Sequence, residues 1–208
     1  MSTFFSKILI TLFLSTMITA NAGDLSNWMK EKASTLRGFK ELLVTEIAMP
    51  GTHDALTYRL GKEKRADGKT GIAVKTPILG SAITKVAKAQ GDNIIGQFAN
   101  GSRYFDLRIA KTKNGFEGVH TLYNGPIEKS FRDFKDFLKK HPGEIVLMDI
   151  NSIKSKHINE FMHLIKDIFG SMIYPRTKDR IKVTYQSLVS SGQRVIFFVN
   201  TLKKTKQI

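Results

Sequence analysis

The chain has 208 residues, a length that fits one domain, and it carries a formal net charge of +15 at pH 7. It contains no cysteine, so thiolate metal sites and a thiol nucleophile are excluded. So basic a chain favours anionic partners, namely acidic membranes, phospholipid head groups or nucleic acid, although solvation of an exported protein is the commoner role of such charge.

The first 22 residues are typical of a secretory signal peptide. Lys7 precedes an apolar run over 8–18, and Ala20-Asn21-Ala22 matches a small-x-small cleavage site. The apolar run is too short for an ordinary transmembrane helix, and an uncleaved interfacial anchor is the alternative. We therefore expect cleavage after Ala22, a mature domain over 23–208, and a secreted or periplasmic protein.

The predicted mature chain begins with a helix and a strand. Asp24 or Ser26 would cap the helix, which runs to Leu36. An apolar, partly β-branched run over 42–49 predicts a strand buried on both faces. Pro50 and the glycine after it end this strand, because proline lacks the N–H that a strand ladder needs.

His53 and Asp54 follow directly after this strand. Titratable side chains at the end of a buried strand are costly for packing and useful for catalysis. A strand-ending turn with a solvated His-Asp pair is the plainer alternative. Residues 61–80, rich in Gly and Lys, predict a long loop, and residues 82–89 predict a helix that can extend over 94–99.

Residues 101–110 predict a second strand with two unlike faces, by the period of two. One face holds Arg103, Phe105 and Leu107, and the other holds Tyr104, Asp106 and Arg108. An Asp and an Arg two apart on an otherwise apolar strand point into the same space, either as a structural ion pair or as part of a site.

Residues 116–126 predict a third strand that ends at His120 and is followed by a turn at Gly125-Pro126. Two histidines, two aspartates and one arginine therefore stand at three successive strand ends. The C-terminal half predicts a helix over 130–138 capped by Ser130 and Asp133, a strand over 144–150, a helix over 155–169 and a strand over 194–200.

This alternation, with polar residues at strand ends, predicts an α/β fold of the (β/α) barrel type. We count five core strands, whereas eight are needed to close such a barrel, so we expect an incomplete barrel. Its fifth strand, 194–200, would then be an exposed apolar edge, and we expect the chain to be marginally stable or to self-associate.

Four segments, in this order, resemble the X-domain of phosphatidylinositol-specific phospholipase C, in its bacterial-type, metal-independent form and close to the X-domain-containing subgroup. They are PGTHD at 50–54, GSRYFDLRI at 101–109, VHTLYNGP at 119–126 and HPGEIVLMDIN at 141–151, preceded by Trp28-Met29. The resemblance covers about residues 26–200. It implies a TIM-type barrel that cleaves phosphatidylinositol-type lipids to diacylglycerol and a cyclic inositol phosphate.

The resemblance also implies the roles of the site residues. His53 would be the general base, His120 the general acid and Arg108 the phosphoryl clamp, while Asp54 and Asp106 would orient these groups. In the calcium-dependent relatives an Asn follows the first histidine and an acidic residue matches Arg108. Because an arginine cannot ligate calcium and can replace its charge toward phosphate, we expect no metal ion and no cofactor.

Two departures from the bacterial pattern bear on the substrate. Asn151 stands where the bacterial enzymes carry a lysine that contacts inositol, so we place Asn151 and Asp149 in substrate binding. The late aspartate of the family, which partners the first histidine, would lie on a strand that we do not find. We therefore expect His53 to lack that partner and no carboxylate from 150–208 to lie near it.

Two alternatives to an exported phospholipase remain. One is a truncated, weakly active or inactive barrel that binds anionic lipid without turnover. The more distant one is a basic nucleic-acid-binding protein, although the sequence has no zinc-finger spacing, helix-turn-helix signature or RNP-type aromatic motif. The expected partner is thus a phospholipid at an anionic membrane surface, and no nucleic acid.

Overall fold

The computed structural model describes residues 23–59, 88–120, 122–175 and 182–201. The predicted signal peptide, the predicted loop over 61–80 and most of the helix predicted over 82–89 lie outside these ranges. The helices are α2 (Trp28–Thr35), α5 (Ile94–Ala99), α6 (Glu128–Lys139), α7 (Ile158–Phe169) and α8 (Tyr185–Ser191), with short 3-10 helices at Phe39–Glu41, Val44–Glu46, Ser155–His157 and Gly170–Met172. The strands are β1 (Gly51–Thr52), β2 (Tyr104–Thr112), β3 (Gly115–His120), β4 (Leu122–Pro126), β5 (Val146–Ile153) and β6 (Val195–Thr201).

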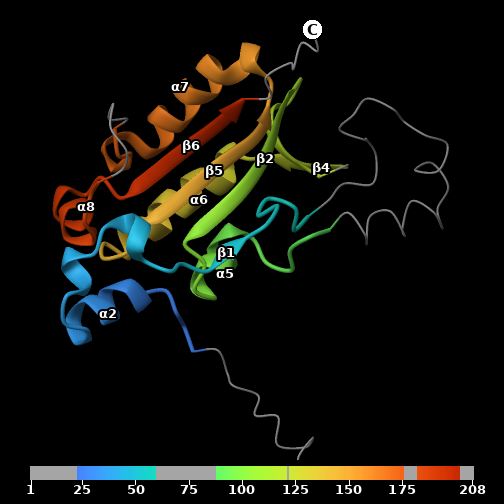
Figure 1. The fold of residues 1–208 in the computed structure, drawn as a ribbon. Coiled ribbons are helices and arrows are strands. Elements are labelled where there is room, and N and C mark those ends of the chain that lie inside the picture. Colours follow the sequence, from blue (N-terminus) through green and yellow to red (C-terminus); the bar gives the residue numbers. More distant parts are fainter. Residues whose placement is uncertain (1–22, 60–87, 121, 176–181, 202–208) are drawn as a thin grey trace, which may run out of the picture.

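The strands form one mixed sheet with β2 at its centre (Figure 1). On one edge of β2, β5 pairs in parallel over Tyr104–Arg108, and β6 follows β5, also in parallel. The other edge pairs in parallel with the two residues of β1, and farther along it pairs antiparallel with β3, which continues into β4. The four parallel strands therefore end along one border of the sheet.

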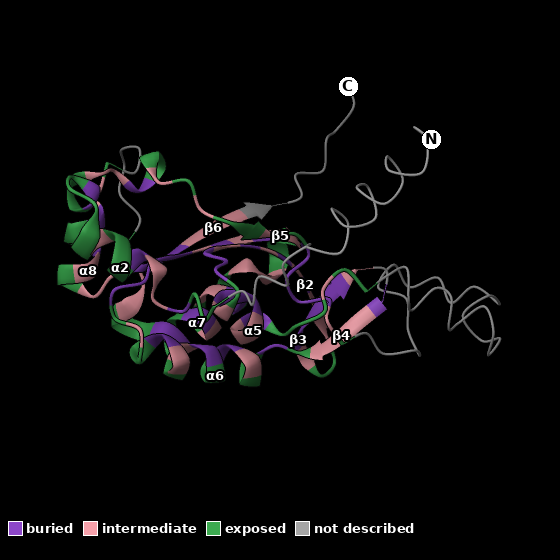
Figure 2. Ribbon diagram, turned by 90° about the horizontal axis from the view of Figure 1, so that it is seen from below, coloured by how far each residue is buried: buried purple, intermediate pink, exposed green. Residues whose placement is uncertain are grey.

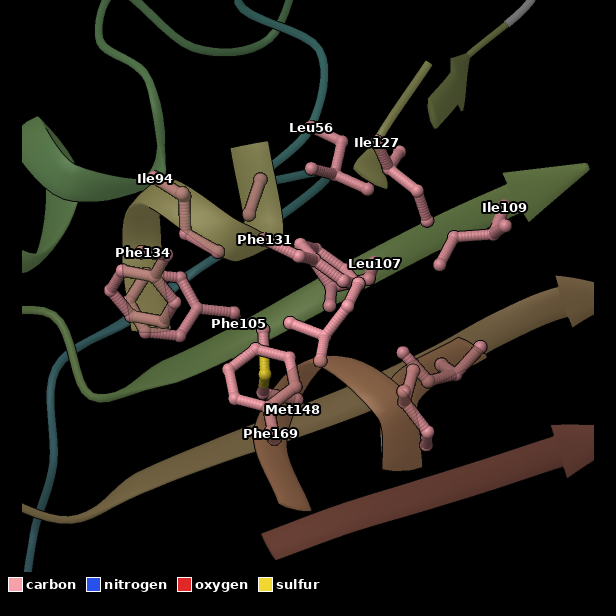
Figure 3. Packing of buried hydrophobic residues seen from close by; sticks show 14 of the residues in the cluster. Leu56, Ile94, Phe105, Leu107, Ile109, Ile127, Phe131, Phe134, Met148 and Phe169 are labelled. Carbon is pink, nitrogen blue, oxygen red and sulfur yellow. The ribbon is translucent and has the colours of Figure 1, made fainter. Parts of the chain in front are cut away.

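One face of the sheet is covered by α5, α6 and α7. Alternate residues of β2, namely Phe105, Leu107 and Ile109, point into this layer and are fully buried. They pack against aromatic side chains of the helices, including Phe131 and Phe134 (Figure 3). Burying each such side chain contributes about 1.5–3 kcal/mol, so this layer is the main core of the domain.

In the part of the chain that the structure describes, the opposite face is covered only near the amino ends of β5 and β6. There α2, α8 and the 3-10 helices near residue 40 pack on Ile145 and Ile196. Figure 2 shows α6 and α7 on one side of β5 and β6, with α2 and α8 gathered at one end. Toward the carboxyl ends of the strands, this face carries half-buried polar residues of β2 and β5 instead.

Within the described residues the sheet does not close, as predicted for a partial barrel. β6 pairs along its length with β5, and at its other edge Tyr174 N–H donates to Val195 O at 2.9 Å. Beyond that contact, the sheet order ends at β6. Self-association through this edge stays a prediction. No described helix combines the length and apolar character that crossing a lipid bilayer requires.

The strand predicted over 42–49 is wrong. The segment forms a 3-10 helix at Val44–Glu46, and the strand that follows, β1, has only two residues. The Glu46 carboxylate accepts a hydrogen bond from Leu43 N–H at 2.8 Å, and Val44 N–H donates to Val183 O at 2.9 Å. The backbone N–H groups of the segment thus find partners within the segment and in the chain before α8. Val44 is still buried, in the smaller core cluster that holds Ile145 and Ile196.

Other predicted boundaries of strands and helices also differ from those in the structure. The strand predicted to end at His120 is β3, but a further strand, β4, follows it, and Gly125-Pro126 lies in β4 rather than in a turn. α5 is a separate helix, because Asn93 Oδ1 caps it by accepting from Gly96 N–H at 2.9 Å. The caps predicted for the first helix and for 130–138 are also wrong: Asn27 precedes α2 and Ile127 precedes α6. α8 was not predicted from the sequence.

A buried ion pair joins α2 to the beginnings of β2 and β5. Arg103 and Glu144 are both fully buried, with Arg103 Nη2 at 2.7 Å and Nε at 2.8 Å from Glu144 Oε2. Arg103 also donates to the carbonyl oxygens of Leu25, Phe98 and Ser102, while Glu144 accepts from the backbone N–H groups of Met29 and Lys30. Burial lowers the pKa of the Arg103 guanidinium and raises that of the Glu144 carboxyl, against the attraction between them.

Replacing Glu144 with glutamine leaves this guanidinium buried without its counter-charge. Breaking a buried pair from one side typically costs about 3–5 kcal/mol, so we expect Glu144→Gln to lower the free energy of unfolding by about that much, as measured by urea denaturation. Glu128→Gln, which breaks an exposed pair with Arg132 on α6, is the control and should keep the urea midpoint of the parent. Equal midpoints for both variants would contradict the importance of the buried pair.

Candidate active site

The predicted site residues meet at the border where the parallel strands end. The register pairs Thr52 of β1 with Phe105 of β2, so the chain leaving β1 runs beside Asp106, and Ala55 N–H donates to Asp106 O at 2.8 Å. On the other edge of β2 the register pairs Asp106 with Asp149 and Arg108 with Asn151. His120 enters from the end of β3.

Asp54 is the residue on which these side chains converge. Its carboxylate is 1% exposed, and Arg108 Nε lies 2.6 Å from its Oδ1. His53 Nε2 and His120 Nε2 lie 3.3 Å and 3.5 Å from its Oδ2. A buried carboxylate is costly unless cations accompany it, and here one permanent cation and two imidazoles do so.

The backbone of Asp54 adopts an uncommon conformation. Its φ of +51° lies in the left-handed region, which costs an L-residue of order 1 kcal/mol. The Thr57 hydroxyl and the Thr57 N–H both donate to Asp54 O, at 2.7 Å and 2.9 Å. The same turn packs closely on β3: a Cβ at Gly118 would lie 2.6 Å from the Leu56 Cβ. The sequence thus holds the turn in place with Thr57 on one side and glycine on the other.

His53 is held from a second side by Asp106. Its side chain is 68% exposed, yet its Nδ1 lies 2.7 Å from Asp106 Oδ2. Asn151 Nδ2 donates to the other oxygen, Asp106 Oδ1, at 2.8 Å. Gln90 Nε2 donates to the His53 carbonyl oxygen at 2.7 Å, a contact that no motif in the sequence indicated.

In place of the late aspartate of the family, His53 has the two aspartates that were expected to orient it: Asp106 contacts its Nδ1 and Asp54 its Nε2. The narrower expectation concerned carboxylates of residues 150–208. Among the described residues of that range, none forms an ion pair with His53. The site thus draws both carboxylates from β2 and from the turn after β1.

Asp149 contacts Tyr104, which lies two residues before Asp106 on the same face of β2. The Tyr104 hydroxyl donates to Asp149 Oδ2 at 2.6 Å. This hydrogen bond, aided by burial and by the negative charge of Asp149, raises the pKa of Tyr104 to about 12. The predicted role of Asp149 and Asn151 in substrate binding stays a prediction, and the contacts of these residues join them to β2.

Three side chains of this site, His53, Asp54 and Asp106, carry atoms of the kind that ligate metal ions. Atoms of His53, Asp54 and Asp106 lie within 4.8 Å of one another, close enough for an ion. The guanidinium of Arg108 already contacts Asp54 there, and a second cation beside it would be repelled. The donor set therefore fits an arginine-neutralised site better than a divalent metal site.

Comparison with known proteins finds relatives, although no family model matches the chain. PI-PLC X domain-containing protein 1 of Homo sapiens is 29% identical over 164 residues, which cover 72% of this chain and 50% of that protein. PI-PLC X domain-containing protein 3 of Homo sapiens is 26% identical over 168 residues, which cover 74% of this chain and 51% of that protein. The chain spans about half the length of these relatives.

The structure is similar to phosphatidylinositol-specific phospholipase C from S. aureus, with a TM-score of 0.58 and 21% identity, over 86% of this chain and 53% of that one. The fold is therefore the mixed α/β, TIM-barrel-like fold of these phospholipases, with an open sheet in the described residues. The chain is thus similar in sequence to PI-PLC X domain-containing proteins and similar in fold to bacterial phosphatidylinositol-specific phospholipase C.

The raised pKa of Tyr104 gives a test of its hydrogen bond with Asp149. We expect Tyr104 to titrate near pH 12, as measured by the absorbance change at 295 nm that Tyr104→Phe removes. Because an unfolded tyrosine ionises near pH 10, the stabilisation should be complete below that pH and should be lost as the pH rises toward 12. Asp149→Asn should move this titration toward pH 10. A parent Tyr104 that ionises near pH 10 would contradict the contact.

Proposed function

We propose that the protein is an exported phosphodiesterase of the phospholipase C type, which cleaves phosphatidylinositol-type lipids to diacylglycerol and a 1,2-cyclic inositol phosphate. One observation carries the proposal: two histidines and one arginine converge on the Asp54 carboxylate, within 3.5 Å, at the carboxyl border of the sheet. Base, acid and phosphoryl clamp are the three groups that cleavage of such a phosphodiester needs.

The reaction follows from these positions. His53 takes the proton of the inositol 2-hydroxyl, and the freed oxygen forms a bond to phosphorus. The bond from phosphorus to the glycerol oxygen breaks, and His120 gives a proton to that oxygen, which releases diacylglycerol. Arg108 stabilises the charge on the phosphoryl oxygens, and its planar guanidinium can contact two of them.

We expect the reaction to take place at a membrane surface, outside the cytoplasm and without a metal ion. The formal charge of +15 supports attraction to an anionic membrane surface, where the phospholipid substrate lies. The signal-like residues 1–22 support secretion or export to a periplasm, with cleavage after Ala22. The position of Arg108 against Asp54 supports catalysis without a metal ion.

A second candidate function is binding of anionic lipid by a barrel that is weakly active or inactive. The observation that favours it is the open sheet of the described residues. It differs from the first candidate in one measurable respect: the protein would sediment with phosphatidylinositol vesicles and release no cyclic phosphate.

The two histidines provide the most direct test. We expect His53→Ala and His120→Ala each to lower turnover about 10²–10⁴-fold, which is the usual cost of losing a general base or acid. Phosphorus NMR of phosphatidylinositol vesicles measures the cyclic product. His163→Ala, on the exposed side of α7, is the matched control and should retain the parent rate. Parent-like turnover in either site variant would reject the assignment.

One assay tests both the phosphate contact of Arg108 and the expected independence of metal ions. We expect Arg108→Lys to lower turnover at least about tenfold, because an ammonium group cannot reproduce the two-pronged contact of guanidinium with phosphate. Arg132→Lys on α6 is the control. Excess EDTA should leave the parent rate unchanged, and strong inhibition that calcium reverses would overturn the metal-free mechanism.

A further inference from the structure

Two residues form a continuous chain of contacts that ends on the proposed base. Asn151 of β5 donates from Nδ2 to Asp106 Oδ1 at 2.8 Å, and Asp106 Oδ2 lies 2.7 Å from His53 Nδ1. Each oxygen of the Asp106 carboxylate thus has its own partner, and the two partners come from different elements. The chain of contacts crosses β2 from one neighbour to the other.

From this geometry we infer that Asn151 is a positioning residue: it acts through Asp106, which was already expected to orient the site, and thereby fixes the orientation and the tautomer of His53. The inference rests on the proposed function for its catalytic meaning, because only there is His53 the base. It assigns to Asn151 an action through Asp106 rather than a direct contact with the substrate.

The tautomer follows from the partners of the two ring nitrogens. An ionised carboxylate only accepts hydrogen bonds, and His53 faces two of them: its Nδ1 lies 2.7 Å from Asp106 Oδ2 and its Nε2 lies 3.3 Å from Asp54 Oδ2. The Asp106 contact is the shorter one, and Asp54 already pairs with Arg108 Nε at 2.6 Å, so the neutral imidazole carries its proton on Nδ1, toward Asp106. The lone pair then lies on Nε2. Arg108 Nη2, which can only donate, lies 3.3 Å from Nε2 and fits that assignment. The atom left to accept a proton from the substrate is thus the one beside the proposed phosphate clamp.

The contact with Asp106 is the shortest that the ring of His53 makes, and it restrains a ring that packing does not. Its side chain is 68% exposed, so packing does not fix the ring, whereas Asp106 is 15% exposed and held by β2. Asn151 restrains the carboxylate without neutralising it, because an amide donates a hydrogen bond and carries no charge. A lysine at this position would form an ion pair with Asp106 and weaken its hold on His53.

The test removes the amide donor and reads the tautomer of His53 directly. In ¹⁵N-labelled, substrate-free protein, the ring nitrogens of His53 are assigned by their loss in His53→Ala. We expect the parent to show the Nδ1–H tautomer, and Asn151→Leu and Asp106→Asn to show a mixture. Asn100→Leu is the matched control, because Asn100 Nδ2 donates to Asp92 Oδ2 at 3.0 Å in a similar but exposed pair.

Kinetics on phosphatidylinositol vesicles provide the second readout. We expect Asn151→Leu to lower kcat about 10–100-fold, the usual effect of losing a residue that orients another, with KM within about twofold of the parent. A raised KM with unchanged kcat would instead make Asn151 a substrate contact and overturn the inference. So would a parent-like tautomer in both Asn151→Leu and Asp106→Asn. If the tautomer changes as expected but no protein turns over lipid, the positioning pair stands and the proposed function fails.

Discussion

The buried pair of Arg103 and Glu144 is the interaction on which the arrangement of the sheet depends. All three guanidinium nitrogens have acceptors, and the carboxylate binds the amino end of α2 as well. A slip of β2 against β5 by one residue would leave both charges buried without partners, and it would turn each apolar side chain to the wrong face. One charged contact therefore fixes the register of the two central strands.

That register also builds the site. Because side chains alternate along β2, Phe105 and Leu107 face the helices while Asp106 and Arg108 face the open side. The pairing with β5 brings Asn151 beside Arg108, within reach of Asp106. The stability of the core and the placement of the proposed catalytic groups are thus properties of one strand, and neither can be changed there without the other.

The sequence predicts the parts of this molecule that depend on periodicity. The two faces of β2, the helices α6 and α7 and the convergence of His53, Asp54, Asp106, Arg108 and His120 all follow from spacing or from the motifs. The path of 42–49 does not, because an apolar run fits a strand or a buried irregular segment equally well. The contacts of Asn151 with Asp106 and of Gln90 with His53 depend on tertiary packing that no local pattern records.

The shortness of β1 has a consequence for motion. Two residues, Gly51 and Thr52, join the turn that carries His53 and Asp54 to the sheet, whereas β2 and β5 pair over five. Segments with few backbone hydrogen bonds open at a small fraction of the global unfolding free energy. The turn is therefore held less by strand pairing than by Ala55 N–H on Asp106 O and by the burial of Leu56 in the core, and we expect its other amide hydrogens to exchange faster than those of β2 and β5.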